Sequence, residues 1–139
     1  MTDPFNLERF VEAQAYAYDR ARRELKAGRK ESHWMWFIFP QIAGLGQSAM
    51  SIRFAIASLD EAKAYLAHPV LGPRLRECAT LALDAPNTIA RVIFGPVDEM
   101  KFRSSMTLFA KAAPDEEVFQ RCLDKFFAGA PDPATLARV

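Results

Sequence analysis

Apolar residues recur at helical spacing along short stretches of this chain, and proline or glycine separates one stretch from the next. Residues 71–83 show the pattern most clearly. Their apolar side chains stand at i, i+3, i+4 and i+7 intervals: Leu71, Leu75, Cys78, Ala79, Ala82 and Leu83. Proline removes a backbone donor from a helix interior and glycine favours turns, so each break ends an element. The pattern predicts an all-α fold, a single compact domain of about six to eight short helices joined by short connections.

The size and composition of the chain narrow its class further. A length of 139 residues suits one domain, residues 1–139, and a hydrophobic content of 50% can fill one core. With 12% aromatic residues, the composition excludes a disordered chain. The longest apolar runs fall far short of the roughly 20 residues that cross a bilayer, and the start, MTDPFNLERF, shows no secretory signal. We therefore expect a cytoplasmic protein without a membrane partner. The oligomeric state is not determined by these features.

Cys78 and Cys122 lie far apart, and no CxxC or Cys/His ligand spacing surrounds them. Free cysteine is among the most buried residue types, so we expect two buried, reduced thiols. Metal sites in proteins need ligands at characteristic spacings, and the cysteines and histidines here are scattered. The sequence predicts neither a metal site nor a cofactor.

Individual helices are expected where the apolar pattern meets a capping residue. We expect one helix over residues 7–25, with Asn6 as its N-cap and Gly28 just after its last turn. The apolar run 34–39 fits either a buried strand or a short buried helix, and we favour the helix because no partner strand is present. The other expected segments are 48–58, 61–68 after a cap at Asp60, 70–83, 88–93, 97–113 beyond a break at Gly95-Pro96, 114–128, and 133–136 after a cap at Asp132.

The densest cluster of aromatic residues is the segment HWMWFIFPQ, which spans residues 33–41. A central buried helix explains it most simply, because burying aromatic rings stabilises a core. A second interpretation is a site for a flat ligand such as a nucleobase or nicotinamide. Its ring would stack on the tryptophans, the bracketing polar side chains would bind it, and the following glycines would admit its close approach. The residues concerned are His33, Trp34, Trp36, Gln41, Gly44 and Gly46.

A second candidate is the segment 97–107, in which Lys101, Ser104 and Ser105 fall within one turn of a helix. A lysine beside a serine binds phosphate, or acts as a base when its amine is desolvated. The alternative is an exposed lysine with small packing serines, and the pattern alone favours it. No G-x-S-x-G elbow is present, so nucleophilic serine chemistry has little support.

Residues 20–30 hold a basic cluster in which Glu24 is the only acidic residue. Cations at the end of a helix complement its macrodipole, which accounts for much of this bias. The formal net charge is +1, the pI is near 7.8, and no helix-turn-helix pattern can be placed. These features argue against a nucleic-acid partner, and nucleic-acid binding through this basic cluster ranks third, behind the two hypotheses given below.

Several blocks together resemble a known family. HWMWFIFPQIAGLGQS, AYLAHPVLGPRL, IFGPVDEMKFRSSMTLF and the final DPATL are similar to an uncharacterised family of small bacterial and fungal proteins, catalogued as domain of unknown function 1810. The resemblance covers residues 7–136. It implies an all-α fold with many short helices, and it brings no established activity. The family blocks contain these polar residues: His33, Gln41, Ser48, Lys101, Ser104 and Ser105.

A weaker similarity is to helical proteins associated with NAD and ADP-ribose, which hydrolyse N-glycosidic bonds. It implies acidic and lysine residues around an aromatic-lined pocket, and Asp98 and Glu99 are carboxylate candidates only by their proximity to Lys101.

The leading hypothesis is a protein that binds a small phosphate-bearing ligand, nucleotide-like or ADP-ribose-like, with hydrolysis of that ligand as its possible reaction. His33 and Lys101 are the candidate catalytic residues. The candidate ligand contacts are Trp34, Trp36, Gln41, Gly44, Gly46, Ser48, Ser104 and Ser105. This hypothesis predicts that the side chains of His33, Trp36, Gln41 and Lys101 converge on one pocket. The alternative is a non-enzymatic protein-interaction module with the aromatic segment as its core.

Overall fold

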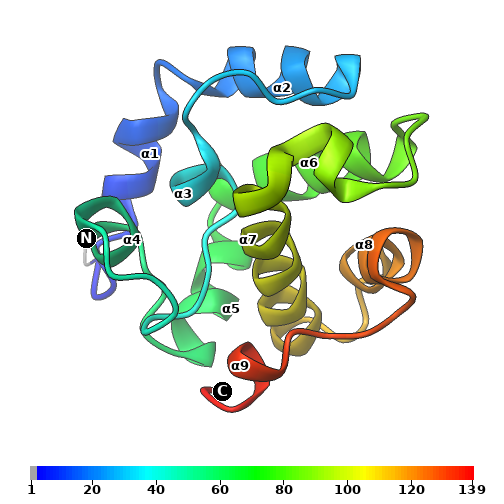
Figure 1. Ribbon diagram of the computed structural model, residues 1–139. Coiled ribbons are helices and arrows are strands. Elements are labelled where there is room, and N and C mark those ends of the chain that lie inside the picture. Colours follow the sequence, from blue (N-terminus) through cyan, green and yellow to red (C-terminus); the bar gives the residue numbers. More distant parts are fainter. Residues whose placement is uncertain (1–2) are drawn as a thin grey trace.

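A computed structural model describes residues 3–139, and these residues form nine helices (Figure 1). Their bounds are α1 Glu8–Gln14, α2 Tyr18–Ala27, α3 Met35–Ile38, α4 Ala49–Arg53, α5 Leu59–Ala67, α6 Leu71–Asp84, α7 Ala90–Ala112, α8 Glu117–Phe127 and α9 Pro133–Leu136. The described residues contain no strand, and a single parallel bridge joins Ile42 to Ile56. The all-α prediction is confirmed, with one helix more than expected.

The segment predicted as one helix over 7–25 is divided into two helices. α1 ends at Gln14 and α2 begins at Tyr18, and the two helices pack against different partners, α3 and α6 respectively. The buried side chain of Gln14 holds the end of α1 in place, because its amide donates to the carbonyl of Phe37 at 2.8 Å and to the hydroxyl of Tyr65 at 3.1 Å. A short turn barely disturbs hydrophobic periodicity, so the pattern does not reveal it.

The N-cap predictions are partly wrong. Asn6 has a left-handed backbone (φ 52°) and does not cap α1; Asp3 accepts the amides of Leu7 and Glu8 instead. Ser58, rather than Asp60, caps α5 by accepting the amide of Glu61. Both outcomes reflect competition between neighbouring cap-forming side chains, which backbone geometry decides.

Other predicted boundaries are confirmed. Gly28 follows α2 in the left-handed conformation at φ 78°, and Asp132 caps α9 with Pro133 in its first turn. The aromatic run forms a short helix, α3, as favoured over a strand. Gly95 (φ 86°) and Pro96 break the helical backbone where expected, although the two segments remain joined as a kinked α7.

α7 is the central helix of the fold, and it packs against α5, α8 and α9 (Figure 1). Phe102 of α7 lies at the centre of an aromatic cluster. Its ring centroid is 4.4 Å from that of Phe94, 5.0 Å from that of Phe39 and 5.8 Å from that of Phe126. These rings join the two parts of α7 to α8 and to the residue that follows α3. The core therefore fixes where the exposed side of α7 lies.

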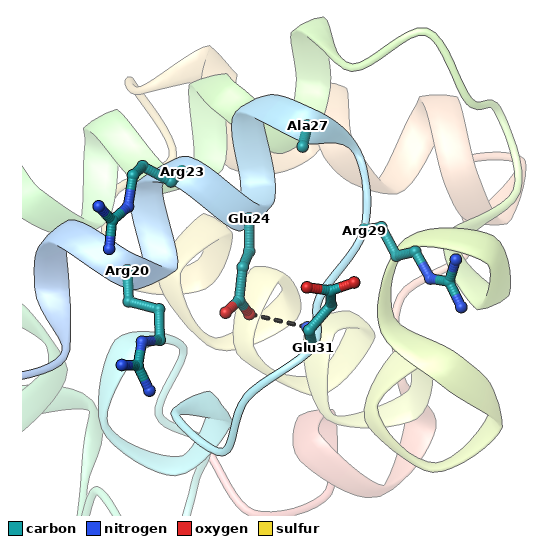
Figure 2. A pocket seen from close by; sticks show the side chains of 6 residues that line it. All are labelled: Arg20, Arg23, Glu24, Ala27, Arg29 and Glu31. Atoms are coloured by element: carbon teal, nitrogen blue, oxygen red, sulfur yellow. Dashed lines mark hydrogen bonds between the residues drawn. The ribbon is translucent and has the colours of Figure 1, made fainter.

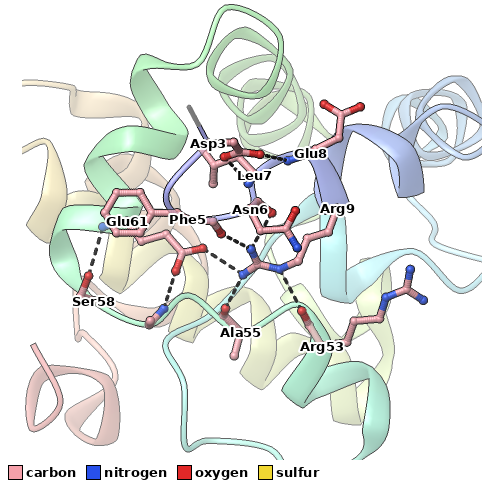
Figure 3. Close-up of polar contacts among 11 residues, drawn as sticks. Asp3, Phe5, Asn6, Leu7, Glu8, Arg9, Arg53, Ala55, Ser58 and Glu61 are labelled. Carbon is pink, nitrogen blue, oxygen red and sulfur yellow. Dashed lines mark hydrogen bonds and ion pairs between the residues drawn. The ribbon is translucent and has the colours of Figure 1, made fainter. Parts of the chain in front are cut away.

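Arg9 of α1 holds the N-terminal segment against the body of the protein (Figure 3). Its guanidinium donates to the carbonyls of Phe5, Asn6, Arg53 and Ala55 at 2.5–2.9 Å. It also pairs with the buried carboxylate of Glu61 at 2.9 Å. A guanidinium has enough donors to serve all these acceptors at once, which a lysine ammonium does not.

None of the helices formed by residues 3–139 is both long and apolar enough to cross a membrane.

Candidate functional site

A groove of about 280 Å³ with both polar and apolar lining lies where the exposed side of α7 meets the loop 41–46 and the start of α9. It is lined by Gln41, Leu45, Gly46, Val97, Met100, Lys101, Ser104, Asp132 and Ala134. A slot of about 10 Å³ adjoins the groove and shares Gln41 and Lys101 with it. The slot also includes Trp36 and has room for about one water molecule.

Lys101 brings a positive charge to this groove. Its ammonium lies 5.1 Å from the centroid of the Trp36 ring, within the range of a cation–π contact. Asp98, one turn earlier on α7, is the carboxylate paired with it, at 3.6 Å. That same carboxylate forms a closer contact of 2.8 Å with Lys30. Asp98 is therefore shared between two lysines, and the charge of Lys101 is only partly compensated.

Ser104 and Asp132 supply the polar wall opposite the loop. The hydroxyl of Ser104 lies 3.0 Å from Oδ2 of Asp132. Oδ2 also accepts the amide of Thr135 at 3.1 Å and its hydroxyl at 2.6 Å. The other carboxylate oxygen of Asp132, Oδ1, accepts no hydrogen bond from the described residues. Asp132 thus has an oxygen available to a ligand although the residue is only 8% exposed.

The indole N–H of Trp36 lacks a hydrogen-bond acceptor among the described residues. Its Nε1 is buried. A buried donor without an acceptor costs about 1–3 kcal/mol, so such groups in folded proteins call for an explanation. A water or a ligand oxygen in the adjoining slot would supply the missing acceptor.

The groove and slot bring together five of the ten residues singled out in the sequence: Trp36, Gln41, Gly46, Lys101 and Ser104. The other five lie elsewhere or serve another purpose. His33 is exposed and lines neither the groove nor the slot. The predicted convergence of His33 with Trp36, Gln41 and Lys101 is therefore wrong, because the chain enters α3 with His33 on the outside.

The other four predicted site residues, Trp34, Gly44, Ser48 and Ser105, line neither the groove nor the slot. Trp34 is buried and donates its indole N–H to Glu24 at 2.9 Å. Ser48 caps α4 by accepting the amide of Ser51. Gly44 has φ 98°, a backbone conformation that residues with a side chain rarely adopt. Ser105 is fully buried, and its hydroxyl has no hydrogen-bond partner within residues 3–139.

Gly46 also has a packing reason to be glycine. A Cβ at this position would stand 2.6 Å from the Cβ of Ser51, well inside van der Waals contact. The close approach holds the loop 41–46 against α4, and it therefore shapes one wall of the groove.

Asp132 is the polar residue of the groove that the sequence did not indicate as a site residue. The Asp-Pro pair identified it as a helix cap, and that task is real. A cap uses one carboxylate oxygen, so the same residue can present the other to a ligand. Only the packing of α9 against α7 shows that this second oxygen belongs to the groove.

The two cysteines are buried, as expected from their residue type. Burial raises the pKa of both thiols to about 12. A thiol with such a pKa is protonated at neutral pH and reacts slowly. Among the described residues, no group of three or more His, Cys, Asp and Glu side chains is arranged to hold a metal ion.

The structure is a small all-α domain with a groove beside Lys101 on its central helix. The chain belongs to the family described as "Protein of unknown function (DUF1810)", whose model matches residues 4–139. It is similar to the conserved hypothetical protein Rv1873 from Mycobacterium tuberculosis, known from a crystal structure. That similarity extends over 97% of this chain and 96% of the other, at 50% sequence identity and a TM-score of 0.95. No match is found among curated proteins.

Proposed function

We propose that the groove binds a small ligand that carries both a phosphate and a hydroxyl group, such as a nucleotide or a sugar phosphate. The observation that carries this proposal is the pairing of opposite chemistries in one groove. A partly compensated cation, Lys101, stands on the same stretch of α7 as Ser104, which contacts the carboxylate of Asp132. The ammonium of Lys101 can bind a phosphate, and the carboxylate of Asp132 can accept a hydrogen bond from a hydroxyl group.

The remaining lining supports the same assignment. The amide of Gln41 offers both a donor and an acceptor, and the unpaired indole N–H of Trp36 offers a donor beside the slot. Leu45, Val97 and Met100 supply an apolar rim for a sugar or base. A groove of about 280 Å³ lies at the lower end of the range for small-molecule sites, so it suits a mononucleotide better than a dinucleotide.

Binding, rather than hydrolysis, is the activity that this lining favours. Acid–base catalysis requires groups within reach of the reacting bond. His33, the candidate general acid–base, lies outside the groove, and Asp132 is the carboxylate among the lining residues. Lys101 therefore serves the proposal as a charge contact for phosphate rather than as a base.

The test is thermal unfolding with ribose 5-phosphate, AMP, ADP-ribose and inorganic phosphate. A ligand at about 100 times its Kd stabilises the native state by about 2.7 kcal/mol, which gives a measurable rise in melting temperature. We expect this rise to disappear in Lys101→Met and to shrink in Asp132→Asn, which retains a capping side chain.

The matched control is Lys111→Met, which removes an exposed lysine from the same helix outside the groove. We expect it to respond to ligand as the wild type does. If none of these ligands shifts the melting temperature, or if Lys101→Met keeps the full shift, the proposal is overturned. The exposed Val97 and Met100 would then favour a protein-interaction surface at the same place.

A further inference from the structure

The exposed side of α2 carries a cluster of cations that lies apart from the groove. We call it the basic face and define it by Arg20, Arg23 and Lys26 of α2 with Arg29 just beyond its end. At about 100° per residue, the three helical members fall within a sector of about 120°, away from the buried Ala21 and Leu25. None of these four side chains takes part in an ion pair within residues 3–139.

The nearby carboxylates do not neutralise the basic face. Arg20, Arg23 and Arg29 surround a depression of about 450 Å³, with Glu24 and Glu31 between them (Figure 2). Glu24 is fully engaged within the protein: it accepts the amides of Glu31 and Ser32, the Ser32 hydroxyl and the indole of Trp34. Glu24 keeps its negative charge while it accepts these hydrogen bonds. Three arginines therefore face two carboxylates in the depression, and the positive charge exceeds the negative by one.

The residues that line this depression suit a nucleic-acid backbone better than a protein partner. Ala27 is the only apolar residue among those that line it. The others are three arginines and two glutamates. Protein–protein interfaces depend on aromatic or aliphatic anchors in apolar pockets. A phosphodiester backbone needs no such pocket, because it is bound through charge and hydrogen bonds to guanidinium groups.

An exposed aromatic residue precedes the helix that carries the basic face. Tyr16 precedes α2 by two positions and is 96% exposed, which makes it the most exposed of the large hydrophobic side chains in the described residues. Burying this ring in the core would have been favourable, and the fold leaves it in solvent at the start of the cationic helix. Basic residues beside exposed aromatic rings are typical of surfaces that bind single-stranded nucleic acids, where bases stack on the rings.

We propose that the basic face and Tyr16 form a binding surface for single-stranded nucleic acid. The arginines and Lys26 contact successive phosphates, and Tyr16 stacks on a base. The net charge of +1 argues against such a partner only as an average, because it combines this face with acidic residues elsewhere on the molecule. The inference is independent of the groove proposed above.

The test is fluorescence anisotropy with a labelled single strand of about 20 nucleotides, titrated at several salt concentrations. If four cations contact phosphates, the affinity falls about 50-fold between about 50 and 200 mM salt. In Arg20→Gln/Arg23→Gln/Arg29→Gln, we expect weak binding with only about a threefold salt effect, because one contact remains. Tyr16→Ala lowers the affinity about fivefold or more, and Tyr16→Phe, which keeps the ring, restores it.

The control is Lys63→Gln/Lys111→Gln/Arg121→Gln, which removes the same charge from exposed positions elsewhere. It retains wild-type affinity if the surface is the one proposed. The proposal is overturned if the strand does not bind at about 50 mM salt, or if both triple variants lose affinity equally. It is also overturned if polyglutamate of equal charge competes as well as an unlabelled strand, since an acidic protein would then be the better partner.

Discussion

The indole N–H of Trp34 donates to Oε1 of Glu24 at 2.9 Å, so the carboxylate of one helix holds the aromatic side chain that precedes another. The same carboxylate accepts two backbone amides and a hydroxyl from the turn between α2 and α3. Burial would raise the pKa of Glu24, but the hydrogen bonds from Ser32, Glu31 and Trp34 outweigh it and lower the pKa to about 2. The turn beside the basic face therefore depends on an ionised side chain.

We expect Glu24 to make the protein sensitive to acid. Its pKa in the folded state lies below its ordinary value of 4.5, so its contribution is fully present above about pH 4.5 and is lost as the pH falls towards 2. Glu24→Gln should cost about 2 kcal/mol of unfolding free energy at neutral pH and much less near pH 3. Urea unfolding at both pH values measures this difference. A gap that does not narrow on acidification would contradict the assignment.

Ser104 and Ser105 are adjacent, and the structure separates their roles. Ser105 is fully buried and its hydroxyl has no hydrogen-bond partner in the part of the chain that the structure describes, so Ser105→Ala should leave stability unchanged or raise it by up to about 1 kcal/mol. Ser104→Ala removes a hydrogen bond to Asp132 and should cost about 1 kcal/mol. Thermal unfolding with and without the groove ligand compares the two. Loss of ligand binding in Ser105→Ala would show that the buried hydroxyl is used.

Gly46 should be intolerant of a side chain because of Ser51. A Cβ on residue 46 would lie 2.5 Å from Oγ and 2.6 Å from Cβ of Ser51. We expect Gly46→Ala to destabilise the protein by about 1–3 kcal/mol. In a double-mutant cycle, Ser51→Gly should cost less in the Gly46→Ala background than alone, because it removes the clash. Simple additivity of the two changes would mean that the loop relaxes without contacting Ser51.

Arg9 should be the most sensitive arginine of the N-terminal segment. Arg9→Met leaves the buried carboxylate of Glu61 without its cation and also unpairs the backbone carbonyls that Arg9 serves (Figure 3). Breaking such a pair costs about 3–5 kcal/mol. Arg53→Met, at an exposed neighbouring position, should change stability by less than about 1 kcal/mol. Chemical unfolding of both variants tests this. Equal effects would remove the special role of Arg9.

Much of the fold could be predicted because its signals are local. Gly28 ends α2, and Asp132 with Pro133 begins α9, because left-handed glycine and the Asp-Pro cap depend on a few adjacent residues. The break between α1 and α2, at residues 15–17, has no such local signal. Apolar side chains keep their spacing across it, and only the different packing partners of α1 and α2 distinguish two helices from one.

The candidate site was predictable in part. Lys101, Ser104, Gln41 and Trp36 attracted notice as polar or aromatic groups in dense blocks, and they line the groove and its slot. His33 attracted notice in the same way and lies outside. Residue type identifies chemical capability, but it does not say which side chains in and before a short helix such as α3 reach a pocket.

Local patterns along the chain specify the class of the fold, the places where most helices end and the set of chemical groups available for a site. These follow from backbone preferences and hydrophobic spacing, which act over a few residues. The packing of the helices decided that Glu24 pairs with Trp34 and that Asp132 joins Lys101 in one groove. It also left Arg20, Arg23 and Lys26 of α2 without an ion pair among the described residues. Those outcomes depend on which helices pack together, because contacts between residues far apart in the chain are set by the shape of the whole core.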